Sequence, residues 1–106
     1  MKYTLHQLEI FRKVAEVKSV TKASEQLFLT QPAVSIQLKN FQDQFNRPLF
    51  EVVGRKLYIT EFGEEISETA FKILEQVAAI SYKSALFDGK LAGKLKISIV
   101  STAKYV

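Results

Sequence analysis

The sequence predicts a mainly α-helical fold, in which three short helices and a two-stranded β-hairpin precede one long helix. Apolar residues recur at helical spacing in three successive stretches, and each stretch opens on a residue suited to cap a helix. Two β-branched and aromatic runs then flank a glycine-containing loop, which is typical of a hairpin. Residues 61–88 continue the helical pattern, so we expect one small domain followed by a helical extension.

The first two helices each begin at a recognisable cap. Thr4 is followed by Gln7 at the spacing of a capping box, so the first helix is expected to run from Thr4 to about Val17. The second helix has either Ser19 or Thr21 as its cap. The apolar residues that form its predicted buried stripe are Val20, Ala23 and Leu27.

The third helix lies in the sequence TQPAVSIQLKNFQDQF, which begins at Thr30. Either Thr30 is the cap and Pro32 lies in the first turn, or Gln31 is the cap and Pro32 is the first helical residue. The restriction on a residue that precedes proline favours the second arrangement. The helix is expected to reach Phe45, because Asn46 tolerates the left-handed conformation that ends a helix and a proline follows shortly after.

One residue of this helix, Ile36, is on the polar side. At ~100° per residue, Ile36 points away from the apolar stripe and lies beside Ser35 and Lys39. The residues of the apolar stripe are Val34, Leu38, Phe41 and Phe45. A single hydrophobic residue on a surface is common and needs no partner. The polar and basic neighbours of Ile36 nevertheless indicate that a ligand binds this surface.

The hairpin is expected to have strands at residues 49–53 and 57–60, joined by the loop Gly54-Arg55-Lys56. Because two strands alone are marginally stable, the hairpin must pack against the helices. Three helices followed by a hairpin make a winged helix-turn-helix domain. Its predicted boundaries are residues 1–60 for the whole domain, 20–39 for the helix-turn-helix segment and 49–60 for the wing.

The long helix predicted at residues 61–88 is about 40 Å long at ~1.5 Å per residue. Some of its apolar residues follow the four-three spacing of a coiled-coil seam, and a second apolar stripe lies beside them. The helix either packs along its own domain or pairs with a second copy. We favour a homodimer, because the outer half of the helix extends beyond what the small domain can cover. The seam residues, which are the predicted dimer contacts, are Ile66, Ala70, Ile73, Val77, Ile80, Ser84 and Phe87.

The net charge of +4 is unevenly distributed along the chain. Residues 1–60 hold nine Lys and Arg against five Asp and Glu, whereas residues 61–88 hold two against six. Residues 89–106 hold four Lys and no acidic residue. A basic first domain favours a polyanionic partner. With no cysteine, no signal-peptide pattern and no apolar run of membrane length, we expect a soluble cytoplasmic protein.

Residues for catalysis are scarce, and we expect no enzyme activity. The single histidine, His6, lies in the first turn of a helix, where a surface role explains it. Glu61, Glu64, Glu65 and Glu68 open the long helix, where acidic side chains complement the positive end of the helix dipole. We therefore expect neither a metal site nor a cofactor in this chain.

The third helix is well supplied for reading DNA, because the second helix of a helix-turn-helix enters the major groove with its N-terminal residues leading. Gln31 can pair with adenine through two hydrogen bonds, Ser35 can contact base edges or phosphates, and Lys39 can reach the backbone. Ile36, and with it Pro32, can pack against the C5-methyl group of thymine. That contact explains an exposed isoleucine among polar residues.

The tip of the hairpin adds Arg55 and Lys56 as candidates for contact with the neighbouring minor groove or backbone. A solubilising turn is the alternative, more so for Lys56 than for Arg55. Two other functions stay open: a helical protein-interaction module that uses the seam and the basic face, and a winged-helix structural subunit without sequence preference. Salt-dependent binding to random duplex DNA would exclude the first, and preference for an inverted repeat the second.

These motifs together resemble the N-terminal part of a LysR-type transcriptional regulator. The matching segments, in order, are SVTKAS, TQPAVS, PLFE, GRKLYIT and FG, followed by a long helix and GKLAGKLKIS. The resemblance covers essentially the whole chain. It implies a winged DNA-binding domain, a linker helix that dimerises antiparallel with a partner's, and an effector domain that senses a small-molecule inducer. Full-length members usually form tetramers on interrupted inverted repeats.

Carried over position by position, the resemblance also implies roles for single residues. Ile36 and Val52 stand where many members have Arg, which implies fewer phosphate contacts and more methyl contact. A relative's operator sequence should therefore not be transferred to this chain. The implied recognition-helix and wing contacts are Thr30, Gln31, Pro32, Ser35, residue 36 and Arg55.

The resemblance makes residues 89–106 a hinge and the first strand of a truncated effector-binding domain. Within that strand region, Ser101 and Thr102 are the candidates for an effector pocket that is incomplete in this chain. The sequence VSTAKY, together with an aliphatic residue at position 36, is similar to the branch that regulates carbon-fixation operons.

Overall fold

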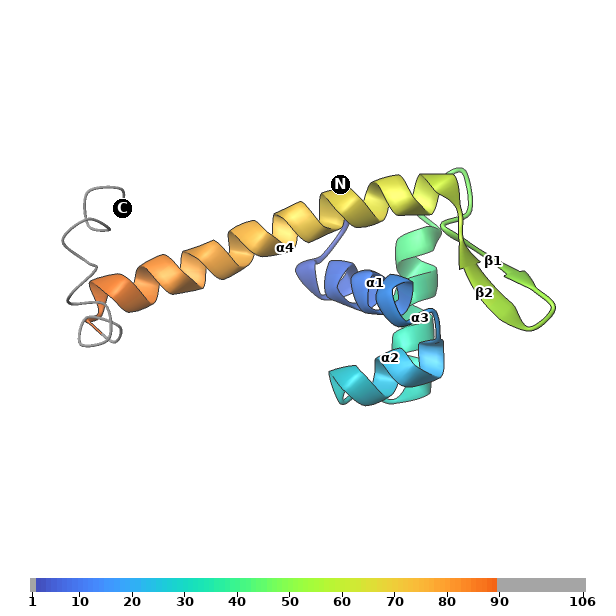
Figure 1. The fold of residues 1–106 in the computed structure, drawn as a ribbon, viewed down its shortest axis with the longest axis horizontal. Helices are drawn as coiled ribbons and strands as arrows, with labels where there is room; N and C mark the ends of the chain where they lie inside the picture. The colour runs from blue at the N-terminus through green and yellow to red at the C-terminus, as the bar shows by residue number, and fades with distance from the viewer. Residues whose placement is uncertain (1, 90–106) are drawn as a thin grey trace. The chain divides into compact units, whose positions relative to one another are not determined.

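The computed structural model describes residues 2–89, which contain four helices and one two-stranded antiparallel sheet (Figure 1). In chain order, the elements are α1 (Leu5–Val17), α2 (Val20–Leu27), α3 (Gln31–Gln42), β1 (Phe50–Val53), β2 (Lys56–Ile59) and α4 (Glu61–Phe87). The predicted mainly helical class, with three helices, a hairpin wing and a long helix, is confirmed. The strand expected in residues 95–106 lies outside the described residues.

The chain divides into two compact units, of which the first extends to Leu74 and the second begins at Glu75. The first unit contains α1 to β2 together with the beginning of α4. The core of this unit therefore continues past residue 60, where the sequence placed the end of the winged domain.

Capping bonds determine where α1 and α2 begin. The Thr4 hydroxyl accepts a hydrogen bond from the Gln7 backbone N–H at 3.0 Å, and the Gln7 side chain accepts one from the Thr4 N–H at 3.2 Å. These two bonds complete the predicted capping box. For α2, the Ser19 hydroxyl accepts a hydrogen bond from the Lys22 N–H at 3.1 Å, so Ser19 rather than Thr21 is the cap.

Helix α3 starts one residue earlier than the sequence favoured. Thr30 is its N-cap, with an extended backbone and a hydroxyl that accepts a hydrogen bond from the Ala33 N–H at 3.2 Å. Gln31 is therefore the first helical residue and Pro32 the second, and the favoured cap at Gln31 was wrong. A threonine cap contributes ~1 kcal/mol, which outweighs the milder restriction on a residue before proline.

Helix α3 also ends earlier, at Gln42 rather than Phe45. Asp43 follows as a right-handed C-cap, and Asn46 has no positive φ, so the expected left-handed stop was wrong. Phe45 nevertheless packs where the apolar spacing predicted, with its ring 5.4 Å from that of Tyr3. Phe45 reaches the core because the chain bends after the end of α3, and not because the helix continues.

Helices α1 and α2 each end on a left-handed residue that is not glycine. Lys18 (φ 55°) follows α1, and Phe28 (φ 57°) follows α2. The Lys18 N–H donates to the Val14 carbonyl at 2.7 Å, which closes the last turn of α1. A left-handed conformation costs an L-residue roughly 1–2 kcal/mol, so both positions hold a side chain where glycine would be more stable.

The core of the first unit consists of two clusters of buried side chains. Helix α1 supplies residues to both clusters, and α2 and α3 pack against α1 and against each other. The buried residues are Leu8, Phe11, Phe41, Leu49 and Ala70 in one cluster, and Ile10, Val14, Ala23 and Val34 in the other. Half-buried Val20 and Leu27 join the second cluster, so the predicted stripe of α2 is confirmed.

The wing is a tight hairpin in which Val53 of β1 pairs with Lys56 of β2. Gly54 and Arg55 alone lie between the strands, and both have positive φ (55° and 69°), as a type I′ turn requires. The predicted three-residue loop was therefore one residue too long, because Lys56 belongs to β2. The hairpin residues that pack against the core are Phe50, Leu57 and Ile59.

Helix α4 is attached to the hairpin by its cap and by a glycine. The Thr60 hydroxyl accepts a hydrogen bond from the Gly63 N–H at 2.9 Å and donates one to the Pro48 carbonyl at 2.8 Å. Gly63 is buried, and a Cβ there would overlap the Leu49 carbonyl oxygen and lie 2.7 Å from Ile59 Cγ1. The missing side chain is what lets α4 approach the backbone that precedes β1.

Candidate nucleic-acid interface

The exposed face of α3 carries the side chains that the sequence placed there. Val34 and Phe41, on the opposite face, are at most 1% exposed, whereas Ile36 is 58% exposed. The prediction that Ile36 lies on the surface is confirmed. The predicted DNA-contact residues that are exposed on this helix are Gln31, Pro32, Ser35, Ile36 and Lys39.

Packing against α1 and α2 holds this face outward. Both α2 and α3 contact α1, and α2 and α3 contact each other (Figure 1). The Gln7 side-chain amide also donates a hydrogen bond to Gln37 Oε1 at 3.3 Å. The cap of α1 is thereby connected to the middle of α3, and the orientation of the exposed face follows from the core.

Two of the candidate contact residues already have partners within the protein. Thr30 uses its hydroxyl to cap α3, and Lys39 Nζ lies 2.7 Å from Asp43 Oδ2. Both side chains of this ion pair are more than half exposed, and such pairs contribute ~0–1 kcal/mol. Lys39 can therefore turn to a phosphate at little cost, but the Asp43 carboxylate stays close to any phosphate that Lys39 binds.

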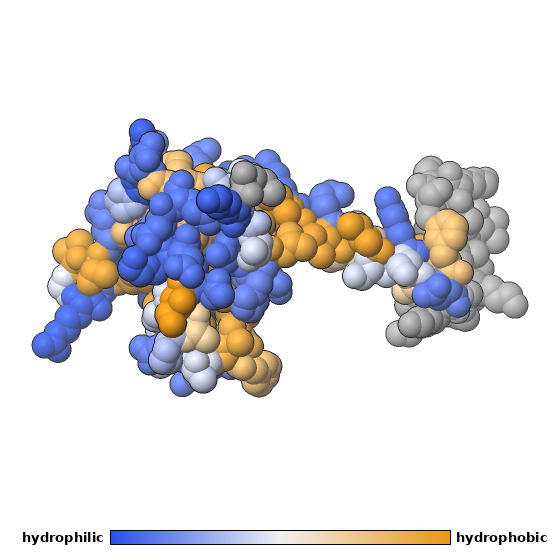
Figure 2. Space-filling model, turned by 180° about the vertical axis from the view of Figure 1, so that it is seen from behind, coloured by the Kyte–Doolittle hydropathy of each residue, from blue (hydrophilic) through white to orange (hydrophobic). Residues whose placement is uncertain are grey.

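The surface of the winged domain mixes hydrophilic and hydrophobic side chains. Figure 2 shows hydrophilic side chains over much of one face of the winged domain, interrupted by separate hydrophobic patches. The exposed large hydrophobic residues of α3 and the wing are Ile36, Val52, Val53 and Tyr58. Apolar contacts with a ligand are thus offered by single side chains among polar ones.

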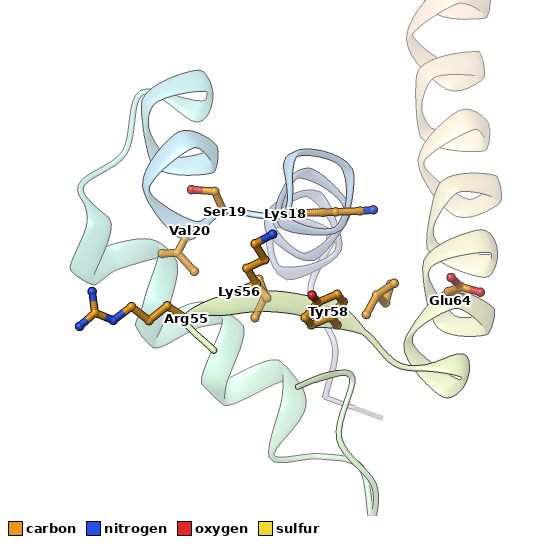
Figure 3. Close-up of a pocket in the computed structure, with 9 residues that line it drawn as sticks. Lys18, Ser19, Val20, Arg55, Lys56, Tyr58 and Glu64 are labelled. Atoms are coloured by element: carbon orange, nitrogen blue, oxygen red, sulfur yellow. The ribbon is translucent and has the colours of Figure 1, made fainter. Parts of the chain in front are cut away.

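The wing presents Arg55 and Lys56 to solvent, and the two side chains have different surroundings. Arg55 leaves the end of the hairpin below Val20, whereas Lys56 reaches from β2 toward Lys18 and Ser19 (Figure 3). Both predicted wing residues are therefore exposed at or next to the turn, and Lys56 faces the connection between α1 and α2.

A hollow of about 690 Å³ lies between β2, the connection from α1 to α2 and the start of α4 (Figure 3). Its charged and hydroxyl-bearing walls include Lys18, Ser19, Arg55, Lys56 and Glu64. The sequence pointed to Arg55 and Lys56 but missed the other residues. Lys18 and Ser19 lie far from the wing in the sequence, so no local pattern indicates that they share a surface with it. Only the fold brings them beside Arg55 and Lys56.

The predicted dimer contacts on α4 differ in exposure. Ala70 is 1% exposed within the core of its own unit, so its prediction as a dimer contact was wrong. Ile66 is half-buried and packs against the same core cluster of its own unit. Ile80 and Phe87 are 68% and 82% exposed. Of the remaining seam residues, Val77 is half-buried, while those that are exposed are Ile73 and Ser84.

Other classes of site find little support in the described residues. Residues 2–89 contain no group of three or more His, Cys, Asp or Glu that could hold a metal ion. None of the described helices is long and apolar enough to cross a membrane. His6 is exposed, and the candidate effector residues Ser101 and Thr102 lie outside the described part of the chain.

Comparison with known proteins gives consistent matches. Residues 5–64 match the family model of the bacterial regulatory helix-turn-helix proteins of the lysR family. Over 102 residues the chain is 39% identical to the RuBisCO operon transcriptional regulator of Acidithiobacillus ferrooxidans, covering 96% of this chain and 33% of that protein. It is also 39% identical over 102 residues to the HTH-type transcriptional activator CmpR of Synechocystis sp., covering 96% and 34%.

A solved structure with a similar fold is the BenM_DBD/catB site 1 DNA complex. The similarity has a TM-score of 0.76 at 28% identity and covers 81% of this chain and 97% of that one. Since the curated relatives are matched over 33–34% of their length, this chain spans about a third of such proteins.

Proposed function

The chain belongs to the lysR family of bacterial regulatory helix-turn-helix proteins, and from this premise we propose that it is the DNA-binding part of a sequence-specific transcriptional regulator. The observation that carries the proposal is the exposed face of α3. There Gln31, Ser35 and Ile36 stand on the outer side of a helix whose other side is packed into the core. An amide, a hydroxyl and an aliphatic group are the kinds of group that match base edges in the major groove.

In this proposal α3 enters the major groove with its first turn leading. Gln31 forms two hydrogen bonds with an adenine, and Ser35 bonds to a base edge or a phosphate. Ile36 and Pro32 pack against thymine methyl groups. A half-site rich in A·T pairs is therefore the expected target of this helix.

The DNA backbone and the neighbouring groove are assigned to other residues of the same domain. Thr30 and Lys39 lie at the two ends of the exposed α3 face, where they meet the phosphates beside the major groove. Arg55 enters the adjacent minor groove, and Lys56 contacts its backbone. These contacts orient α3 and supply most of the salt-dependent affinity.

Pairing of α4 with a second copy is the proposed source of a homodimer. Exposed Ile80 and Phe87 are unfavourable in water unless something covers them, and a dimer would present two α3 helices to an inverted repeat. In the full-length regulator, we propose a tetramer and a small-molecule inducer, with Ser101 and Thr102 lining the inducer site. Because the relative from Acidithiobacillus ferrooxidans is named a RuBisCO operon transcriptional regulator, we propose that the full-length protein acts in the cytoplasm on a carbon-fixation operon.

Fluorescence anisotropy with labelled duplexes tests the proposed function. We expect random duplex DNA to bind with an affinity that falls steeply as salt rises, by a slope of about −0.9 per neutralised phosphate. An inverted repeat, selected from a random-sequence library, should bind more tightly at every salt concentration. No binding at low salt would refute the proposal and favour a protein-interaction module, and equal affinity for both duplexes would favour a structural subunit.

Ile36→Arg is expected to strengthen binding to random DNA and to reduce the preference for the selected repeat. The new guanidinium gains a phosphate contact, while the apolar contact with thymine is lost. Titrations over a range of salt should show the slope of log K against log salt becoming steeper by about one. Ile36→Leu keeps an aliphatic group and serves as the control; an unchanged slope for Ile36→Arg would show that this position does not face DNA.

A further inference from the structure

One side chain of α1, that of Arg12, connects this helix directly to α4. Arg12 Nη1 donates a hydrogen bond to Ser67 Oγ at 2.8 Å, and Arg12 Cζ lies 4.8 Å from the centre of the Phe71 ring. All three residues belong to the first compact unit, where α1 lies next to the beginning of α4 (Figure 1). Among residues 2–89, this is the only hydrogen bond between α1 and α4, and no ion pair joins the two helices.

Arg12 has these partners although carboxylates are near. Glu16 lies four residues further along α1, the spacing at which opposite charges usually pair on a helix, but its partner is Lys13 at 3.3 Å. Glu16, Glu64 and Glu68 line a hollow of about 470 Å³ together with Arg12. Within the described residues, none of these carboxylates forms an ion pair with Arg12. The half-buried guanidinium thus binds a hydroxyl and a ring on the other helix instead of a charge on its own helix.

The core contacts between α1 and α4 are of another kind. Leu8 and Phe11 of α1 share a cluster of buried apolar side chains with Ala70 of α4. Apolar contact keeps two surfaces together, but it is non-directional and does not by itself determine how one helix is turned against the other. A hydrogen bond requires a distance and an angle, and a planar guanidinium stacks on a ring in one orientation. The contacts of Arg12 therefore add a directional constraint to the apolar packing.

We propose that Arg12 is a positioning residue that, through Ser67 and Phe71, fixes the start of α4 on the winged domain and thereby determines which spacing of half-sites the protein accepts. The inference rests on the proposed function and on the proposed homodimer. In that dimer the paired α4 helices connect two winged domains, so the attachment of each domain to its α4 sets the separation of the two α3 helices. Half-sites suit such a pair when their centres are about 10–10.5 base pairs, or a multiple of this, apart.

A fixed attachment pre-organises the dimer for one spacing of half-sites. A loose attachment must be ordered each time the dimer binds, which lowers the affinity for the best spacing, but it also tolerates other spacings. The expected mark of a positioning role is therefore a change in spacing preference. A purely structural role would lower the Tm and leave that preference as it is.

Ser67→Ala tests the proposal most directly. Ser67 is 6% exposed, so an effect of its hydroxyl on DNA binding must act through Arg12. Affinities are measured for the selected inverted repeat and for duplexes in which one or two base pairs are added between its half-sites. We expect the wild type to bind the altered spacings about tenfold more weakly. In Ser67→Ala and in Arg12→Met, this difference should fall to about threefold or less, with weaker binding to the original spacing.

Further variants distinguish the contact from its charge. Arg12→Lys keeps the charge but cannot stack flat on Phe71, so it should not restore the wild-type preference. The double variant Arg12→Met with Ser67→Ala should behave as Arg12→Met does, because both changes break one contact. Lys2→Met removes one charge from an exposed position of the same domain and is the control, with wild-type spacing preference expected. Thermal melts confirm that each variant is folded at the temperature of the titrations.

A spin label measures the positioning without DNA. Because the chain contains no cysteine, a cysteine introduced at exposed Gln26 of α2 carries one label per chain. Double electron–electron resonance then gives the distribution of distances between the two labels of a dimer. We expect a narrow distribution for the otherwise unchanged chain and a broader one after Ser67→Ala.

Several results would overturn the inference. Wild-type spacing preference and an unchanged distance distribution in Ser67→Ala would do so even if Arg12→Met loses the preference, because Arg12 would then contact DNA or the second copy directly. A loss of preference in Lys2→Met would assign the effect to charge alone. Equal affinity of the wild type for every spacing, or binding as a monomer, would overturn the inference and leave sequence-specific binding intact. Failure of the wild type to bind any duplex would overturn both.

Discussion

Gln31→Ala is expected to remove ~1–3 kcal/mol of discrimination at one base pair while leaving the affinity for random DNA nearly unchanged. Gln31 is the exposed first residue of α3, and in the proposed complex its amide leads the helix into the groove. An alanine leaves the adenine edge without its two hydrogen bonds, so the correct base loses its advantage over the others. Titrations against the selected repeat and its single-base variants measure the change position by position.

A matched control for this substitution is Gln76→Ala. Gln76 is also an exposed helical glutamine, but it lies on α4, outside the proposed interface. The control should leave both affinity and base preference as in the wild type. An equal loss on selected and random duplexes after Gln31→Ala would contradict base reading and place this side chain against the backbone.

Gly63→Ala is expected to destabilise the winged domain, although alanine is the better helix former by about 1 kcal/mol. The added Cβ would overlap the carbonyl oxygen of Leu49, and a backbone atom cannot move aside as the end of a flexible side chain can. Overpacking of this kind costs ~1–3 kcal/mol. At ~4–8 °C per kcal/mol for a domain of this size, the loss is visible in the Tm from a thermal melt followed by circular dichroism.

The control for Gly63→Ala is Thr69→Ala, at an exposed position on the same helix. It should keep the wild-type Tm or raise it slightly, because alanine favours the helix and no contact is lost. DNA binding measured well below the Tm separates stability from function. A Tm for Gly63→Ala at or above that of the wild type would show that α4 does not need the close approach to Leu49.

Local signals in the sequence were sufficient for most of the fold. The capping box at Thr4 and Gln7 involves residues three apart, and the Gly54 turn lies between two β-branched and aromatic runs, so neither depends on distant contacts. The exposed position of Ile36 followed from helical periodicity alone. These features were predictable because each is determined within one or two turns of chain.

The differences arose where distant packing competes with local preference. Phe45 is buried as its spacing indicated, but a turn carries it to the core, since a periodic pattern reports burial and not the length of a helix. Ala70 fits the four-three spacing of a coiled-coil seam, but its side chain is buried in the core of its own unit. The left-handed residues Lys18 and Phe28 are of types that rarely adopt that conformation, so the sequence contained no signal for them.

The two-residue turn at Gly54 and Arg55 has a consequence for the proposed contact of the wing with DNA. A mobile tip loses ~1–2 kcal/mol of backbone freedom for each residue that it orders on contact, whereas this tip holds its arginine on a backbone already shaped. In the proposed complex with DNA, such a support cannot adapt to a wide minor groove, so the width of the groove decides whether the Arg55 guanidinium reaches both walls. Sequences that narrow the minor groove beside each half-site would thus be selected by their shape, at base pairs that no side chain reads.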